Sequence, residues 1–299
     1  MTTLGRRAWV EQIMGMPISL HVRQGVDDPA TAAAVREAFT LLRTVDRRFS
    51  TYRDDSEISR LNRGELRLRD THPEVREVVR LCTVARQRTG GYFDAWGPAD
   101  AGETDAAGLL ADPAPNGPVS AVLRSLPEAR DAAGLPVPVA VESAESGGVL
   151  VRPQVSRRWF DPSGLVKGWA VQRAADLLTG HGVTDFCLNA GGDIALRCAP
   201  GAPGWRVGVE DPADPSRLLA VLEVTDGAVA TSGTARRGTH IYDPHTGGPA
   251  TRLASVTITG PDLTWADVYA TAIAAASGRR FDLPAPYQCP IVSRFDLVR

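Results

Sequence analysis

Helix-like and strand-like patterns of apolar residues are interspersed along this chain without the regular strand–helix–strand rhythm of a parallel sheet. Residues 18–22 alternate apolar and polar side chains as a strand does, whereas residues 30–49 carry an apolar stripe with helical spacing. Because regular βαβ units are absent, the sequence predicts the α+β class, with mixed sheets and interspersed helices. The other expected helices cover residues 73–85, 165–178 and 264–277, and the other expected strands cover 185–189, 193–197, 205–210, 218–224 and 255–260, with the segment GAVATSG left without an assigned type.

Three segments do not carry a clear helix or strand pattern. Residues 49–65 are rich in Ser, Asp and Arg, so we expect a loop between two helices. Residues 98–150 are rich in Pro, Ala and Gly and contain no aromatic residue, and we expect a variable segment without chemistry inside one domain that spans residues 1–299. Residues 278–299 lack a strand pattern, so we expect the chain to end without a closing strand.

Charge and composition exclude several classes of protein. With 33 Lys and Arg against 35 Asp and Glu the net charge is −2, which argues against a general nucleic-acid or membrane-surface binder. No apolar run approaches the roughly 20 residues that cross a bilayer, and we expect a cytoplasmic protein without a membrane span. The 4 cysteines form no CxxC pair, which predicts free thiols.

The basic residues contain one exception. Of the 33 Lys and Arg, Lys167 alone is a lysine, and either a compact ammonium is needed there or a surface lysine stands there by chance. It stands in FDPSGLVKGWA, residues 160–170, where a glycine turn opens a helix and offers free backbone N–H groups to an anion. An ordinary helix start capped by Asp161 explains the same pattern.

Two glycine-containing stretches follow this helix. In LNAGGDIAL, Gly191 and Gly192 precede Asp193 between two apolar strands, either as a plain hairpin turn or as a close backbone approach to a ligand. Residues 229–249 gather hydroxyls, imidazoles and a carboxylate around glycines, and His240 is either a structural histidine or a general base.

The last helix carries a carboxylate and a hydroxyl one turn apart. Asp267 and Thr271 are at positions i and i+4, on one face, and both supply the hard oxygen atoms that Mg²⁺ prefers. By spacing alone an exposed polar pair explains them better than a metal site does. The surrounding residues are apolar all round the helix, which predicts burial, so a metal or a donor is expected beside Asp267.

Together these stretches resemble the ApbE family of FAD:protein FMN transferases. The resemblance covers most of the chain, in family order. The motifs that carry it are MGMPISLHV, DRRFSTYRDDSEISRLN, TGGYFDAW, FDPSGLVKGWAV, LNAGGDIAL, ATSGTARRGTHIYDPHTGGPA and SVTITGPDLTWADVYATA.

The resemblance implies a Mg²⁺-dependent transfer of FMN from FAD to a Thr or Ser hydroxyl of an acceptor flavoprotein, with release of AMP. It assigns the metal to the oxygens of Asp267, Thr271 and Gly164, and catalysis to His240 and Lys167. Two alternatives stay open, a Mg²⁺-dependent FAD pyrophosphatase and a non-catalytic flavin-binding protein, and so does the formation of a homo-oligomer. The implied contacts of FAD are Met14, Tyr52, Tyr92, Phe93, Asp94, Asp161, Lys167, His240 and Ile241.

Overall fold

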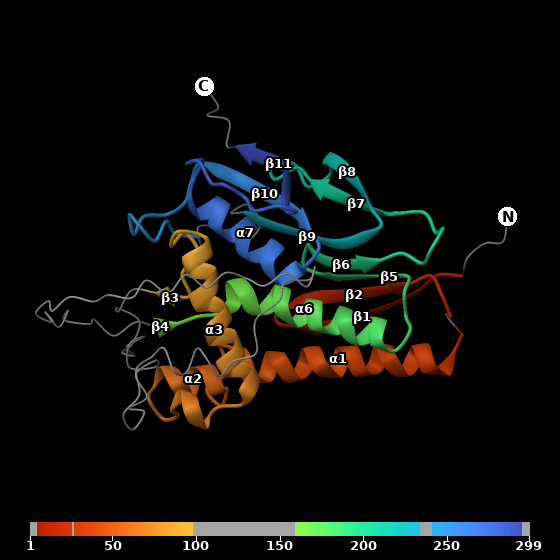
Figure 1. Cartoon of the computed structure of the whole chain (residues 1–299), viewed down its shortest axis with the longest axis horizontal. Coiled ribbons are helices and arrows are strands. Elements are labelled where there is room, and N and C mark those ends of the chain that lie inside the picture. The colour runs from red at the N-terminus through yellow and green to blue at the C-terminus, as the bar shows by residue number, and fades with distance from the viewer. Residues whose placement is uncertain (1–4, 26, 98–158, 234–240, 295–299) are drawn as a thin grey trace, which may run out of the picture.

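A seven-stranded sheet forms the centre of the molecule in the computed structural model, which describes residues 5–25, 27–97, 159–233 and 241–294 (Figure 1). Its strand order is β1-β2-β5-β6-β9-β10-β11, and each neighbouring pair is antiparallel. The α+β prediction is therefore confirmed. The strands of this sheet are β1 (Arg7–Ile13), β2 (Met16–Val22), β5 (Phe186–Ala190), β6 (Asp193–Arg197), β9 (Asp226–Gly233), β10 (Leu253–Gly260) and β11 (Gln288–Arg294).

Helices cover one face of this sheet, and they match the helical patterns of the sequence. Helix α6 (Ser163–Gly180) lies between α1 (Pro29–Phe49) and α7 (Leu263–Ala275), as Figure 1 shows. Helix α3 (Pro73–Arg88) begins after His72, whose ring accepts a hydrogen bond from the Glu74 amide. The apolar stripe of α1 is buried, and α7 is buried on nearly all sides.

Alternation along the central strands separates two apolar layers. Ala195, Ala228 and Ala230 face the helices, and their small size lets α6 and α7 approach the sheet closely. Ile194, Leu196 and Val229 face the other way and pack against the two-stranded ribbon of β7 (Trp205–Glu210) and β8 (Leu218–Val224). Asp193 has the parity of Ala195, so its side chain is directed toward the helices.

The loop prediction for residues 49–65 is wrong in part. Helix α2 (Glu57–Asn62) lies inside it, and Ser56 caps the helix by accepting the Ser59 amide at 3.0 Å. Ile58 and Leu61 are buried on its inner side. The helix is too short for a periodic pattern to stand out among the polar residues around it.

The expectation for the end of the chain is also wrong. Strand β11 pairs with β10 and closes the sheet, and Pro290 within it obscures the strand pattern. Proline is tolerated there because β11 is an edge strand, where one side needs no ladder hydrogen bond, and the register shifts beside it. Strand β1, at the opposite edge, was not foreseen either.

The expected variable segment, residues 98–150, lies wholly outside the described residues. On its two sides, the short strands β3 (Trp96–Gly97) and β4 (Trp159–Phe160) pair with each other, and the 3-10 turn η1 (Leu68–Asp70) precedes α3. Within the part of the chain that the structure describes, no helix is both long and apolar enough to cross a membrane.

Candidate active site

The turn between β5 and β6 places a carboxylate at the end of the sheet. Gly191 and Gly192 both have positive φ, 64° and 103°, which glycine adopts without strain. Asn189 closes the turn by accepting the Gly192 amide at 2.9 Å. Asp193 follows with 0% exposure, and its Oδ1 accepts the Thr231 amide of β9 at 3.1 Å. This carboxylate is therefore fixed to two neighbouring strands.

The single lysine of the chain lies between two buried carboxylates. Its Nζ contacts Asp193 Oδ2 directly and lies 3.6 Å from Asp267 Oδ1. The side chain of Lys167 is 18% exposed, so its ammonium keeps some access to solvent while the two carboxylates have almost none. The sequence predicts that Asp267 is buried with a metal or a donor beside it, and the burial is confirmed, with the Lys167 ammonium as one neighbour of the carboxylate.

Helices α6 and α7 are in close contact at Gly168. A Cβ atom placed there would lie 2.8 Å from the Leu263 carbonyl oxygen and 2.9 Å from Asp267 Cβ, so no larger residue fits without separating the helices. The Gly168 amide donates to Asp267 Oδ2 at 3.2 Å. In a regular α-helix that amide is the partner of the Gly164 carbonyl, whose second lone pair leaves room for another ligand.

Hard oxygen atoms gather one turn further along α7. Thr271 Oγ1 is hydrogen-bonded to Ser232 Oγ of β9 at 3.1 Å. A Cβ on Gly164 would lie 3.9 Å from Thr271 Cγ2, which places the first turn of α6 beside Thr271. The carboxylate of Asp267, the hydroxyl of Thr271 and the carbonyl of Gly164 are a donor set that suits Mg²⁺.

This donor set contains one carboxylate, as a magnesium site completed by phosphate and water does. Accordingly, the residues that the structure describes hold no group of three His, Cys, Asp or Glu side chains that could bind a metal ion. A site of the zinc type is thus absent from these residues.

A second polar group forms a rim between α3 and the segment after α7. The rings of Tyr92 and His245 meet edge to face at 4.6 Å, and His245 Nε2 lies 3.0 Å from the Gly90 carbonyl oxygen. Arg279 pairs with the buried Asp243 at 3.1 Å and donates to the Tyr92 hydroxyl at 3.5 Å. The segment from residue 241 to 250 is thereby tied to the end of α3.

The pairing of β3 with β4 links this rim to the lysine helix. Asn62, 2% exposed, holds Phe160 at both its amide and its carbonyl, at 3.0 and 2.9 Å. Asp161 accepts the Ser163 amide at 2.9 Å from the position before the N-cap, which is Pro162, so the interpretation of Asp161 as the cap residue itself is wrong. Phe93 lies against Gly164, because a Cβ on that glycine would be 3.2 Å from the Phe93 ring.

The Cys82 thiol is unsuited to act as a nucleophile. Burial raises the pKa of the Cys82 thiol well above its usual range, and the carboxylates of Asp161 and Asp94 raise it further. The thiol is therefore neutral at physiological pH and is a poor nucleophile. The described cysteines are all free, as the sequence predicts.

The other predicted contacts of FAD lie in varied surroundings. Met14 has φ 55° in the turn between β1 and β2. This turn lies next to the glycine turn between β5 and β6, because a Cβ on Gly191 would be 2.9 Å from Met16 Sδ. Asp94 pairs with Arg86 at 3.1 Å, and Ile241 is buried. Tyr52 is 97% exposed and, among the described contacts, has only a backbone bond to Ser50. His240 lies outside the described residues.

Two residues of the site were not assigned a role from the sequence. Asp193 was noted only as part of a turn, and its contact with Lys167 joins residues far apart in the chain. Asn62 was noted only within a motif. Its type gave no usable signal, because its burial at the end of the short helix α2 shows only in the structure.

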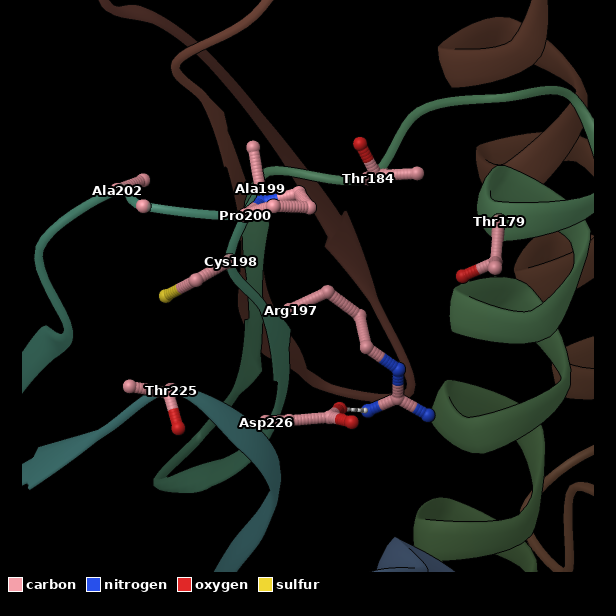
Figure 2. Close-up of a pocket in the computed structure, with 10 residues that line it drawn as sticks. Thr179, Thr184, Arg197, Cys198, Ala199, Pro200, Ala202, Thr225 and Asp226 are labelled. Carbon is pink, nitrogen blue, oxygen red and sulfur yellow. Dashed lines mark ion pairs between the residues drawn. The ribbon is translucent and has the colours of Figure 1, made fainter.

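A hollow of about 580 Å³ lies elsewhere, at the opposite end of β6. Figure 2 shows Arg197 extending toward Asp226 across it, with Thr179 of α6 on the far side. The ion pair measures 2.9 Å, and the hollow is separated from Asp193 by the length of the strand, about 13 Å. It is therefore not part of the site around Lys167.

Comparison with known proteins identifies the family of this chain. Residues 14–281 match the ApbE family. The chain belongs to the ApbE family. It is 28% identical over 270 residues to a FAD:protein FMN transferase of Vibrio cholerae, covering 83% of this chain and 74% of the relative. It is 30% identical over 271 residues to a FAD:protein FMN transferase of Treponema pallidum, covering 80% and 70%.

Solved structures of this family have the same fold. The flavin transferase ApbE from Vibrio cholerae aligns with a TM-score of 0.62 at 26% identity, covering 91% of this chain and 87% of that one. The ApbE protein of Thermotoga maritima aligns with a TM-score of 0.64 at 20% identity, over 92% and 88% of the two chains, and shows the fold alone.

Proposed function

We propose that this ApbE family member transfers FMN from FAD to a Thr or Ser hydroxyl of an acceptor protein, with Mg²⁺ as cofactor and AMP as the second product. The observation that carries the proposal is the position of Lys167 beside Asp267, next to the oxygens of Thr271 and Gly164. The relatives named FAD:protein FMN transferase support the same reaction.

Charge neutralisation is the main requirement of this chemistry. A hydroxyl that attacks the FMN phosphorus meets oxygens that already carry negative charge, so the site must neutralise and position the pyrophosphate. Mg²⁺ supplies part of this positive charge when it is bound. The Lys167 ammonium supplies the rest from α6, and its partial exposure lets it face a bound phosphate.

The first turn of α6 adds a fixed dipole to this charge. Its N-terminal amides include that of Ser163, which Asp161 accepts, while the following turn delivers Lys167. An anion near a helix N-terminus is stabilised by such amides, typically by about 0.3–1 kcal/mol. Asp161 therefore has a structural role in shaping this turn, whether or not it also contacts FAD.

Deprotonation of the acceptor hydroxyl is assigned to His240 through the family motif. An imidazole titrates near neutral pH and suits general base catalysis. The residues that follow His240 in the chain are held in place, because Ile241 is buried and Asp243 pairs with Arg279. The Tyr92 and His245 rings next to that pair are suitable surfaces for the flavin or adenine ring.

The test is incubation of the purified protein with FAD and Mg²⁺, with and without a Thr-containing acceptor domain. AMP is followed by chromatography and covalent flavin by in-gel fluorescence. We expect AMP and a fluorescent acceptor band, both lost when Mg²⁺ is removed with a chelator. Omission of the acceptor is the matched control, since transfer then has no hydroxyl to modify.

The same experiment separates the two alternative activities. AMP and free FMN in equal amounts, whether or not acceptor is added, would show a pyrophosphatase. FAD that stays intact but bound would show a non-catalytic flavin-binding protein. Either result would contradict the proposed transfer.

A further inference from the structure

The two carboxylates beside Lys167 are not equivalent. The ammonium contacts Asp193 directly, whereas it stands 3.6 Å from Asp267, beyond the usual length of a charge-assisted hydrogen bond. One ammonium faces two carboxylates, so the three groups together carry an excess of negative charge. A divalent cation at Asp267 would reverse that excess and favour binding of a pyrophosphate.

Asp193 is the more rigidly held of the two. It is wholly buried, it begins β6 directly after the glycine turn, and its Oδ1 accepts the Thr231 amide of the neighbouring strand. Its Oδ2 is thus directed at α6 by the backbone of two strands. The ammonium is at the end of a flexible stem, so it adjusts to the carboxylate and not the reverse.

We propose that Asp193 is a positioning residue that retains the Lys167 ammonium and so keeps Asp267 available to a divalent cation. The proposal rests on the proposed function, because it takes Asp267 as a metal ligand. When Asp193 is absent, Asp267 is the remaining carboxylate beside Lys167, and the ammonium moves onto it. The cation and the ammonium then compete for the same oxygen atoms.

The decisive measurement is the affinity for Mn²⁺, a spectroscopic substitute for Mg²⁺, determined by electron paramagnetic resonance without FAD. Asp193→Asn keeps the size of the side chain and an oxygen for the Thr231 amide but removes the charge. We expect about tenfold weaker Mn²⁺ binding, because an ammonium that pairs with Asp267 competes with the cation for the same carboxylate.

A double-mutant cycle with Lys167→Met tests whether Asp193 acts through the lysine. Without an ammonium there is nothing to move onto Asp267, so we expect Asp193→Asn to change the Mn²⁺ affinity by less than about threefold in the Lys167→Met background. A loss of equal size in both backgrounds would overturn the proposal, since Asp193 would then act on the cation directly.

A matched control exists at the other end of the same hairpin. Asp185 is also buried, at 1%, and pairs with Arg23 at 3.0 Å. Asp185→Asn breaks a buried ion pair in the same way but lies away from Asp267. We expect lower thermal stability with unchanged Mn²⁺ affinity, which separates a general structural effect from a local one.

A second readout uses the fact that Lys167 is the only lysine. Labelling lysine with ¹⁵N at Nζ gives one side-chain ammonium signal, which we expect to shift in Asp193→Asn at 5 °C and to stay in place in Asp185→Asn. An unmoved signal in folded Asp193→Asn would overturn the proposal. If that variant does not fold, the wild-type signal must shift on addition of Mg²⁺, and an unshifted signal at saturation overturns the proposal equally.

Failure of this inference is distinguishable from failure of the proposed function. If the wild-type protein transfers FMN but the loss of affinity is independent of Lys167, the positioning role falls and the function stands. If the cycle gives the expected result but no AMP forms from FAD, the function falls and the positioning role stands. Absence of any Mn²⁺ binding by the wild-type protein would remove both the metal site and the positioning role.

Discussion

The hairpin of β5 and β6 has a buried aspartate paired with a basic residue at each of its two ends, and the two pairs are built differently. Asp185 precedes β5 and pairs with Arg23, whose guanidinium also donates to the Pro203 carbonyl at 3.0 Å and lies 3.7 Å from the centre of the Trp205 ring. Asp193 begins β6 and pairs with Lys167, which has a second carboxylate, that of Asp267, within 3.6 Å.

The difference between the two ion pairs follows from the chemistry of their basic groups. A guanidinium is planar, makes several directed hydrogen bonds and stacks on aromatic rings, so the Arg23 end is held by many contacts and acts as a structural clamp. An ammonium is compact and can exchange partners by small rotations of its stem. Among the 33 Lys and Arg residues, the one lysine stands at the site that we propose for the pyrophosphate of FAD.

Removal of Asp267 should have the largest effect. Asp267→Ala takes away the proposed metal carboxylate and leaves Lys167 with Asp193 alone. We expect AMP formation to fall by about a thousandfold or more, as when a major electrostatic group is lost from an active site. Circular dichroism checks that the fold persists, and unchanged AMP formation would contradict the metal role of Asp267.

The second largest effect is expected when Lys167 is replaced by arginine. Lys167→Arg keeps the charge but places a larger, planar group between Asp193 and Asp267, which it would bridge with two sets of hydrogen bonds. We expect about a hundredfold loss of kcat, because an immobilised guanidinium no longer faces the pyrophosphate. Measurement of kcat and KM for FAD under Mg²⁺ saturation tests this expectation. A variant with wild-type kcat would show that exchange of partners is not needed.

Local sequence patterns predicted much of the fold, but only part of the difference between the Asp185–Arg23 pair and the Asp193–Lys167 pair. The long stripes of α1, α6 and α7 were readable because their apolar residues recur over many turns, whereas α2 was too short and β11 was obscured by Pro290. The position of Asp267 and Thr271 on one face was also local information. The contact of Lys167 with Asp193 was not, because it depends on how a helix lies on the sheet.

The buried thiol of Cys187, on the hairpin near Arg23, gives a prediction about how stability depends on pH. Burial raises the pKa of Cys187 from 9.0 to about 11, although Arg6 and Arg23 nearby lower it. Because the folded pKa is the higher one, the stability from this thiol is complete below pH 9 and is lost as the pH rises toward 11.

The size of this loss is about 2 kcal/mol at pH 11, as roughly 1.4 kcal/mol follows from each pKa unit. Urea unfolding of the wild-type protein and of Cys187→Ala between pH 8 and 11 measures it. The difference in unfolding free energy between the two proteins should shrink with rising pH. A constant difference would mean that water reaches the thiol in the folded protein.

The smallest effect is expected from the reciprocal exchange at the arginine end. Arg23→Lys keeps the ion pair with Asp185 but removes the stacking on Trp205 and the fixed geometry of the bond to Pro203. We expect a loss of about 1 kcal/mol in unfolding free energy, the typical value of such a cation–π contact, and no change in AMP formation. If Arg23→Lys instead lowered turnover as strongly as Lys167→Arg, the two ends of the hairpin would be coupled. The lysine would then owe its behaviour to the rigidity of the whole hairpin, because Asp193 can hold the ammonium in place only while β5 and β6 keep their register.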